Sequence, residues 1–339
     1  MCDKPLVSVI TPAYNTGKYI SKLLDSILTQ SYLAIEMIVM DDGSTDNTAD
    51  IVKSYIPQFR DRGYQLNYQY QENSGQSVAI NNALKLIKGK YLVWPDSDDY
   101  YSSSEAIKKM IDEFEKGPDS LGMVRTQEKL IKDKENGIEV IGISGATSKP
   151  YYKAGELFES CLYASDFYFC PGAYMVNISK FVRCNGLEIY TEKDAGQNWQ
   201  IMLPILYSYD CKTIMEPLYN VVVRADSHSR GQYKGYEAEA AKFNSYRNTI
   251  LSTLDKIDMP ISKREYYKQQ IIQKYQLVLF NSAFRNAQYS IGLELFNQLP
   301  LDVQRLKKVI LKKILMQLRL SGLIMANYKA FVRLYRLFR

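Results

Sequence analysis

The chain has 339 residues, of which 46% are hydrophobic and 24% are charged. This composition is typical of a folded globular protein, and it excludes intrinsic disorder, a collagen-like repeat and a small disulfide-stabilised domain. The length allows two domains, or one large domain with an extension.

Positive charge is concentrated at the C-terminal end. Residues 301–339 contain ten Lys and Arg and one acidic residue, Asp302, and so carry a net charge of +9, whereas the first 300 residues carry −3. The near-neutral body argues against nucleic-acid binding, and the basic tail indicates a partner with negative charge.

The cysteines and the hydropathy pattern favour an intracellular protein. The five cysteines form no C-x-x-C pair, which indicates reduced thiols in a cytosolic protein and argues against a zinc site. The first residues contain no apolar signal core, and no run of 18 uncharged apolar residues could span a bilayer. We therefore expect a cytoplasmic protein.

The first hundred residues alternate between strand and helix patterns. In chain order the patterns predict a strand at 6–11, a helix at 19–28, a strand at 35–40, a helix at 46–60, a strand at 66–70, a helix at 77–87 and a strand at 91–94. Such alternation predicts an α/β fold, Rossmann-like, with a mainly parallel sheet and flanking helices. Binding loops should follow the carboxyl ends of its strands.

The remainder of the chain changes from a mixed pattern to a helical one. Residues 121–125 and 214–224 predict further strands among helical pieces. After Gly235 the periodicity is helical, at 236–254, 263–286 and 301–318, with a final helix to about 338. The sequence therefore predicts an α-helical C-terminal region over residues 231–339.

Four polar motifs follow the four predicted strands. They are residues 7–15 (VSVITPAYN), 39–44 (VMDDGS), 72–81 (ENSGQSVAIN) and 94–99 (WPDSDD). Each motif alone is common in ordinary turns, but four in order at consecutive strand ends form a specific signal. Over about residues 5–230 the sequence resembles the family-2 glycosyltransferases of the GT-A fold, of the type that builds bacterial surface glycans. The resemblance implies a catalytic domain at 1–230, with a nucleotide-binding part at about 1–100 and an acceptor-binding part at about 101–230.

The acidic motif at 94–99 points to a divalent cation. A nucleotide-sugar diphosphate is negatively charged, so a cation must lie between it and a D-x-D pair. Oxygen ligands at this spacing suit Mg²⁺ or Mn²⁺, which would act as a Lewis acid that stabilises the departing UDP.

The resemblance also implies roles for individual residues. The nucleotide-sugar site would consist of Thr11, Pro12, Tyr14, Asp42, Asn73, Gly75, Gln76, Asp96 and Ser97. In it Asp42 would accept a hydrogen bond from the uracil ring N–H, and Asp96 would face the ribose. Asp98 would be the direct metal ligand, supported by Asp99.

One position departs from the family pattern. The family often has Arg or Lys before Asn81, where this chain has Ile80. The cationic contact to the nucleotide is therefore missing, or another residue such as Arg224 or Arg230 supplies it.

The single histidine, His228, lies in residues 223–230 (VRADSHSR). Related enzymes carry an R-x-H-x-x-S-like segment there, and neutral imidazole is a suitable third ligand for Mn²⁺. We predict His228 as a ligand of the metal or the pyrophosphate; the alternative is an ordinary surface or core histidine.

Inverting transfer needs a carboxylate that takes the proton of the acceptor hydroxyl. Residues 190–200 (YTEKDAGQNWQ) precede an apolar helix, and by resemblance Asp194 at the helix start is the predicted base, with Glu192 as the alternative. Asp194 as a plain helix cap is also open. Alignment on Trp199, itself a sugar-stacking or a core residue, instead places Gln197 and Asn198 over the family's E-D pair.

The basic tail, residues 301–339, has the pattern of an amphipathic helix. Such a helix suits the anionic inner face of the cell membrane, to which the protein would bind peripherally. The alternatives are packing on the catalytic domain or on a second copy, as in a homodimer.

The favoured function is a metal-dependent inverting hexosyl- or N-acetylhexosaminyltransferase. It would move sugar from a UDP-sugar to a hydroxyl of a glycan, lipid-linked or protein-linked acceptor. One alternative is a catalytically silent nucleotide-sugar-binding scaffold at the membrane. A sugar-1-phosphate nucleotidyltransferase is disfavoured because residues 12–17 lack a Gly-rich basic loop. The absence of G-x-G-x-x-G argues against a dinucleotide oxidoreductase.

Overall fold

The computed structural model describes residues 4–134, 137–145, 149–192, 195–224 and 234–320. The chain divides into two compact units, the first comprising residues 1–225 with 255–258 and the second residues 226–254 with 259–339. Within the described ranges, none of the helices combines the length and the apolar character needed to cross a membrane.

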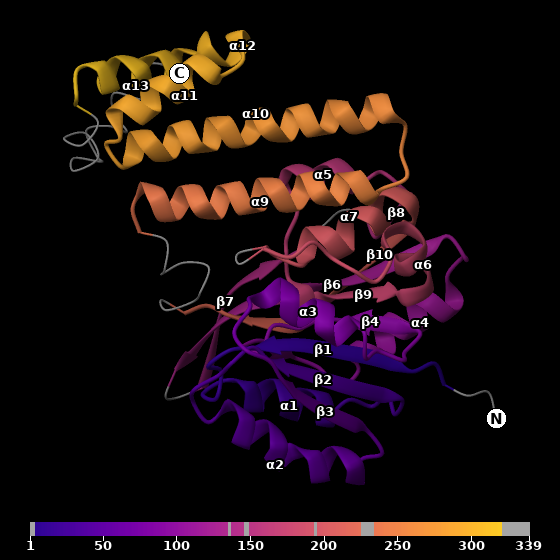
Figure 1. Ribbon diagram of the computed structural model, residues 1–339. Helices are drawn as coiled ribbons and strands as arrows, with labels where there is room; N and C mark the ends of the chain where they lie inside the picture. The colour runs from indigo at the N-terminus through magenta and orange to yellow at the C-terminus, as the bar shows by residue number, and fades with distance from the viewer. Residues whose placement is uncertain (1–3, 135–136, 146–148, 193–194, 225–233, 321–339) are drawn as a thin grey trace. The chain divides into compact units, whose positions relative to one another are not determined.

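The first unit is built on one mixed β-sheet. Its strands are β1 Val7–Ala13, β2 Ile35–Asp41, β3 Gln65–Tyr70, β4 Tyr91–Val93, β5 Tyr100–Tyr101, β6 Leu121–Lys134, β7 Gly137–Ser144, β8 Tyr151–Tyr152, β9 Tyr174–Asn177 and β10 Asp210–Val222. In the described residues their order is β3-β2-β1-β4-β9-β6-β10-β5, with β7 beside β6 and β8 beside β10 (Figure 1).

Strands β1 to β4 are all parallel, as their sequence predicts. Strand β1 pairs with β2 and β4, and β2 pairs with β3. Every residue of β1 and β2 is buried, which is typical of parallel strands covered by helices on both faces. Strand β9 runs antiparallel between β4 and β6, whereas β6 and β10 are parallel, so the complete sheet is mixed.

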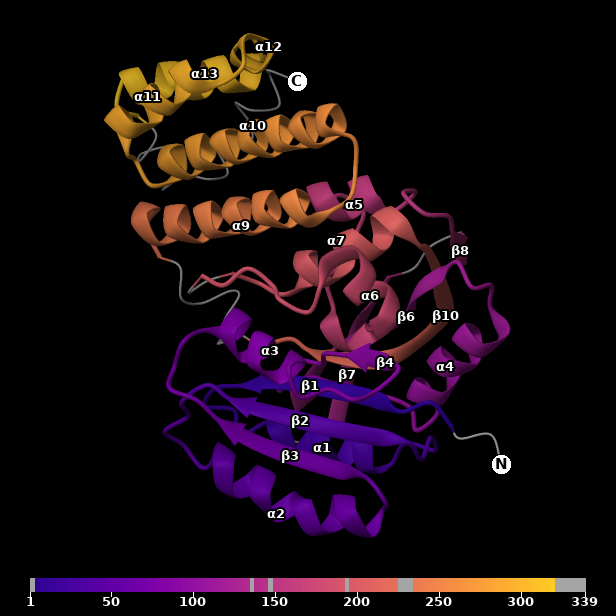
Figure 2. The same ribbon diagram turned by 45° about the vertical axis from the view of Figure 1, so that its right-hand side comes forward.

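Seven α-helices of the first unit flank this sheet in the described residues. They are α1 Ile20–Leu28, α2 Thr48–Asp61, α3 Gln76–Leu84, α4 Ala106–Lys116, α5 Phe158–Tyr163, α6 Ile178–Asn185 and α7 Asn198–Ser208; a short 3₁₀ helix, Pro171–Ala173, precedes β9. Helices α1 and α2 contact each other on one face, and α3 contacts β1 and β2 on the other (Figures 1 and 2). The crossover helices therefore lie where right-handed connections place them.

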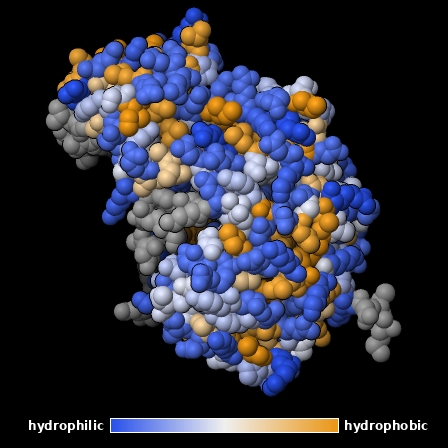
Figure 3. Space-filling view, in the orientation of Figure 1, coloured by the Kyte–Doolittle hydropathy of each residue, from blue (hydrophilic) through white to orange (hydrophobic). Residues whose placement is uncertain are grey.

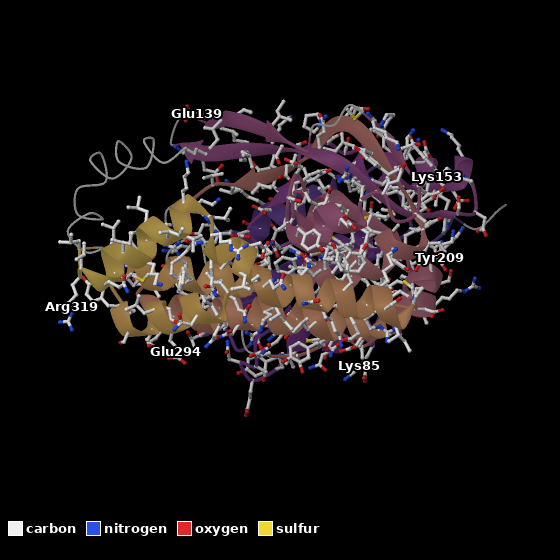
Figure 4. All side chains as sticks on the ribbon, turned by 90° about the horizontal axis from the view of Figure 1, so that it is seen from above. Lys85, Glu139, Lys153, Tyr209, Glu294 and Arg319 are labelled. Carbon is white, nitrogen blue, oxygen red and sulfur yellow. The ribbon has the colours of Figure 1, made fainter. Side chains whose placement is uncertain are left out.

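A long hairpin of β6 and β7 extends the sheet. A register shift between Leu130 and Ile131 bends the pair, as a β-bulge does. Glu139, near the start of β7, lies at the end of this hairpin (Figure 4). The sequence pattern predicted only its first residues, 121–125.

The second unit is entirely helical in the described residues. Its helices are α9 Tyr236–Lys256, α10 Ile261–Arg285, α11 Tyr289–Gln298, α12 Leu301–Gln304 and α13 Lys307–Gln317. Helices α9 and α10 run antiparallel (Figure 2). Glu239 of α9 accepts hydrogen bonds from Ser282 Oγ at 2.6 Å and from Arg285 Nη2 at 2.7 Å.

The predicted helix at 301–318 is two helices, α12 and α13. Leu306 between them has an extended backbone, with φ −64° and ψ 124°. This break turns α13 so that its inner face joins the core of the unit. That core consists of Phe280, Phe284, Phe296, Leu299, Val309, Leu311, Leu315 and Met316. The predicted final helix, to about residue 338, lies outside the described residues.

Lys312 on α13 is partly buried and donates to Asn281 Oδ1 at 2.6 Å. Burial, with the charges of Arg285 and Lys308, lowers the pKa of Lys312 from 10.5 to about 8. Between these two pH values the unfolded chain holds a proton that the folded chain has lost, so stability rises with pH through that window. Below pH 8 both states are protonated and the full cost of the buried charge remains.

We therefore expect Lys312→Met to stabilise the protein at pH 7, by roughly 1–2 kcal/mol after allowance for the partial exposure. The gain should shrink as the pH rises from 8 to 10.5. Thermal unfolding at pH 7 and pH 10 measures both effects, with the exposed Lys307→Met as the matched control. A gain independent of pH would contradict the assignment of the effect to the charge.

Candidate active site

The loops that follow β1, β2, β3 and β4 meet at one edge of the sheet, because these parallel strands end side by side. Hydrogen bonds join the first three loops. Among them, Asn15 N donates to Ser44 Oγ at 2.9 Å, and Gln71 N donates to Asp41 O at 2.9 Å. The structure thus brings the sequence motifs after these strands together.

Asp42 is buried and holds the loop that follows β3. Its carboxylate accepts hydrogen bonds from Gln71 Nε2 at 2.7 Å, Ser74 N at 2.8 Å and Gly75 N at 2.9 Å. Asn73 Nδ2 donates to the backbone oxygen of Asp42 at 2.9 Å. A carboxylate has about four acceptor positions, so one is left for a ligand such as a nucleobase N–H.

Two glycines allow these loops to approach each other. Gly43 has φ +82°, and a Cβ there would lie 2.8 Å from Asn73 N. Gly75 has φ +92° and directly precedes α3. Both conformations favour glycine, and any other residue at 43 would push the two loops apart.

The end of β1 supplies a small polar and aromatic surface. Thr11 and Pro12 are buried, and Thr11 Oγ1 has no hydrogen-bond partner among the described residues. Tyr14 is 44% exposed. Ile80 is fully buried in the core, so position 80 provides packing and no cationic contact to a ligand.

The acidic loop after β4 carries three carboxyl groups in four residues. Asp99 is buried and accepts a hydrogen bond from Val222 N at 2.8 Å, which ties the loop to the end of β10. Asp98 forms an ion pair with Arg224. Asp96 lies 3.4 Å from Gln76 Nε2 of α3, and Ser97 between the two acids is buried.

Burial, together with neighbouring charge, raises the pKa of two of these carboxyl groups. Burial, with the added charge of Asp98, raises the pKa of Asp96 to about 7. Burial and the charges of Asp98 and Asp96 likewise raise the pKa of Asp99 well above its usual value. Carboxylates held together in this way attract a cation.

The acidic loop fits Mg²⁺ or Mn²⁺ as a site in which the protein provides only some of the metal ligands and the substrate provides others. Magnesium sites in phosphate-transferring proteins use one or two carboxylates and take their other ligands from phosphate and water. Asp96 and Asp98 supply such carboxylates. In the described part of the chain no three His, Cys, Asp or Glu side chains form a preassembled metal cluster. The predicted ligand His228, and Arg230 beside it, lie outside the described residues.

The two candidate bases lie just before α7. Glu192 accepts a hydrogen bond from Tyr190 OH at 3.0 Å, and its backbone oxygen accepts one from Ser77 Oγ at 3.1 Å. Asp194 lies outside the described residues. The helix begins at Asn198, so the expectation that Asp194 stands at the helix start is wrong. Before the helix, Ala195 N donates to Glu192 O at 2.9 Å.

Gln197 and Asn198, which an alignment on Trp199 places over the family's E-D pair, lie at the start of α7. Asn198 Oδ1 accepts a hydrogen bond from Trp94 Nε1 at 3.1 Å, next to the acidic loop. Gln197 is buried, and its Oε1 has no partner among the described residues. Trp199 Nε1 donates to Cys161 O at 2.9 Å, and its ring contacts Phe169, with 5.0 Å between the centroids. Trp199 therefore has a packing role.

Comparison with known sequences finds relatives for the part of the chain that carries the four strand-end loops. The family model described as glycosyl transferase family 2 matches residues 8–170. TuaG of Bacillus subtilis, named for teichuronic acid biosynthesis, is 44% identical over 107 residues, which are 32% of this chain and 41% of TuaG. Chondroitin synthase of Escherichia coli is 35% identical over 153 residues, 45% of this chain and 21% of that protein. The matched region spans less than half the length of these relatives.

Solved structures share the fold over nearly the whole chain. TarS 1–349 of S. aureus, in complex with UDP-GlcNAc, superposes with a TM-score of 0.62 at 19% identity, covering 96% of this chain and 92% of that one. The mannosyltransferase PcManGT of Pyrobaculum calidifontis, with GDP-Man and Mn²⁺, has a TM-score of 0.51 at 15% identity, covering 95% and 88%. At such identities the likeness shows the fold alone, which is GT-A.

Proposed function

We propose that this chain, which belongs to glycosyltransferase family 2 through residues 8–170, transfers a sugar from a nucleotide-sugar to a hydroxyl group of a glycan acceptor. A UDP-sugar is the favoured donor, and the acceptor belongs to a surface polysaccharide or a lipid- or protein-linked glycoconjugate. The transfer inverts the anomeric centre and depends on a divalent cation. The reaction takes place in the cytoplasm.

The acidic loop beside the nucleotide loops is the observation that carries this proposal. Asp42 holds the loop after β3 through its contacts with Ser74 and Gly75, which would present Asn73 and Gln76 to the nucleotide. Asp96 and Asp98 lie at the neighbouring strand end, where a diphosphate would follow. Mn²⁺ or Mg²⁺, when bound there, would supply positive charge to the departing nucleotide.

The remaining chemistry is removal of a proton from the acceptor hydroxyl. A carboxylate must accept it as the oxygen attacks the anomeric carbon. Asp194, with Glu192 as the alternative, is proposed for this role. His228 is proposed to assist as a third ligand of the metal or the diphosphate.

Turnover of UDP-sugars distinguishes the enzyme from a silent scaffold. We expect the full chain to release UDP from at least one UDP-sugar in the presence of Mn²⁺, and EDTA to abolish the release. A panel that includes dTDP- and GDP-sugars serves as the control for base recognition. Turnover of one of these, with no UDP-sugar used, would contradict the assignment of Asp42 to uracil. Donor binding without any turnover would favour the scaffold.

A second part of the proposal concerns the basic C-terminal residues. Helix α13 buries one face, yet Leu306, Ile310, Ile314 and Leu318 recur every fourth residue and remain between 40% and 59% exposed. Hydrophobic and hydrophilic residues lie interspersed over this part of the unit (Figure 3). Arg319, at the end of the described residues, points outward (Figure 4). An apolar stripe beside basic residues suits an anionic lipid surface.

Binding to vesicles tests this surface. We expect binding of the full chain to rise with anionic lipid content and to fall with salt. The paired change Lys307→Glu and Lys308→Glu should weaken it at least about tenfold, since each basic residue near the surface contributes about 1 kcal/mol. Deletion of 301–339 is unsuitable, because α13 contributes Val309 and Leu315 to the core.

The matched control is Lys53→Glu with Lys116→Glu, which makes the same change in net charge on exposed positions of the first unit. An equal loss in the control, or binding that ignores anionic lipid, would contradict the membrane proposal. A dimer in sedimentation, lost in the Lys307 and Lys308 variant, would then favour a second copy as the partner.

A further inference from the structure

Asp98 of the acidic loop forms an ion pair with a basic side chain from a distant part of the sequence. Arg224, just beyond β10, forms its ion pair with Asp98 through Nη2 and Oδ2. The two side chains are only 18% and 28% exposed. In the described part of the chain, no other basic side chain forms an ion pair with Asp96, Asp98 or Asp99.

The end of β10 and the ring of Tyr19 hold the guanidinium of Arg224 in this position. The hydrogen bond from Val222 N to Asp99 fixes the end of β10 against the acidic loop. The guanidinium carbon lies 3.7 Å from the centroid of the Tyr19 ring. Tyr19 is itself positioned by the loop after β1, because its N–H donates to Thr16 O at 2.8 Å. Stacking of this kind on an aromatic ring holds a guanidinium without consuming its N–H donors.

Arg224 lies where the carboxyl groups of the acidic loop favour a positive charge. Three neighbouring carboxyl groups repel one another, and partial burial strengthens that repulsion. A cation that lies against Asp98 offsets this repulsion. In the structure that cation is the guanidinium.

We propose that, in the donor-free protein, Arg224 occupies the position of the divalent cation beside Asp98, and that it leaves Asp98 for the diphosphate when the donor binds. In the donor-free protein it neutralises Asp98 and so weakens metal binding there. When donor and metal enter together, Asp98 is released to the metal and the guanidinium turns to the diphosphate oxygens, which its planar fork fits. This inference rests on the proposed function, since it assumes that the acidic loop binds a metal and a nucleotide diphosphate.

The exchange makes metal and nucleotide binding interdependent. The metal takes Asp98 from the ion pair, and the diphosphate takes Arg224 from it. When one ligand has broken the ion pair, the other binds without that cost, so each raises the affinity for the other by the same factor. A protein of this design binds metal poorly until the nucleotide is present. Arg224 is thus a positioning residue of the donor site. In this proposal it also supplies the cationic contact to the nucleotide that Ile80 cannot provide, because it pairs with the acidic loop.

Mn²⁺ binding to the donor-free full chain tests the inference without reliance on turnover. Free Mn²⁺ is measured by electron paramagnetic resonance at pH 8, with and without UDP. We expect Arg224→Gln to bind Mn²⁺ about tenfold more tightly than the wild type without UDP, and to show a smaller gain on addition of UDP. Tyr19→Leu, which removes the stacking surface, should shift the affinity in the same direction by a smaller factor.

Two further variants separate the possible failures. Lys22→Gln removes a positive charge from α1, the helix that follows Tyr19, and serves as a matched control. Lys22 pairs with Asp133 at 2.6 Å and not with the acidic loop, so the Mn²⁺ affinity of this variant should equal that of the wild type. Asp98→Asn should lose the site. Unchanged or weaker Mn²⁺ affinity in both Arg224→Gln and Tyr19→Leu, with loss in Asp98→Asn, would overturn the inference and leave the proposed function standing. Wild-type binding that Asp98→Asn does not alter would overturn the inference together with the metal site of the proposed function.

Discussion

Asp98→Asn is expected to lower turnover about 10³-fold or more and to abolish the dependence of UDP binding on metal. Asp98 is the carboxylate predicted to bind the cation directly, and loss of charge stabilisation on the leaving diphosphate removes several kcal/mol from the transition state. Asparagine keeps the shape of the side chain, so packing should not change. The fold should remain intact, because the substitution reduces repulsion with Asp96 and Asp99, which offsets loss of the ion pair with Arg224.

Steady-state kinetics with a UDP-sugar and Mn²⁺ measure the loss, and UDP titration with and without EDTA measures the binding. Asp133→Asn provides the matched control, since Asp133 pairs with Lys22 on an exposed surface. Full activity of Asp98→Asn in the presence of EDTA would show that the reaction proceeds without a metal at this loop.

Asp194→Asn is expected to lower kcat by roughly 10²–10⁴-fold while UDP affinity changes little. A general base acts on the proton during the chemical step, so its loss is seen in kcat rather than in binding of the donor. The beginning of α7 cannot supply the base, because Gln197 and Asn198 are amides and Asn198 Oδ1 already accepts from Trp94. We therefore propose that the proton acceptor is a carboxylate of the preceding segment.

Glu192→Gln and Tyr190→Phe complete the comparison. Tyr190 OH donates to Glu192 at 3.0 Å, so Tyr190→Phe perturbs Glu192 without removing its carboxylate. If Asp194→Asn retains nearly wild-type kcat and Glu192→Gln loses it, the base is Glu192, and Tyr190→Phe should then change kcat as well. Equal kcat in all three variants would exclude both residues.

The sequence alone determined the first four strands and the loops that follow them. The strands at 6–11, 35–40 and 91–94 were predictable because burial on both faces requires short apolar runs, and the partly exposed strand at 66–70 was predictable from its alternation. The polar residues that follow these strands were visible as turns. Parallel pairing then places those ends at one edge whatever the details of the packing. The helices at 236–254 and 263–286 followed equally from local periodicity, whereas the periodicity did not predict α11 at Tyr289–Gln298.

Only the tertiary structure decided how the acidic loop is held and neutralised. Arg224 and Asp98 are 126 positions apart, and no local pattern pairs them; they meet because β10 lies in the same sheet and its end reaches the loop after β4. The contacts of Asp42 with residues 71–75 are similar, since they depend on how closely two loops approach. Which face of α13 is buried could not be decided from the sequence for the same reason, because Val309 and Ile310 are both strongly apolar. Packing against α10 and α11 buries Val309 and leaves Ile310 exposed. Burial and pairing between distant segments depend on the complete fold, whereas strand and turn patterns depend on near neighbours in the chain.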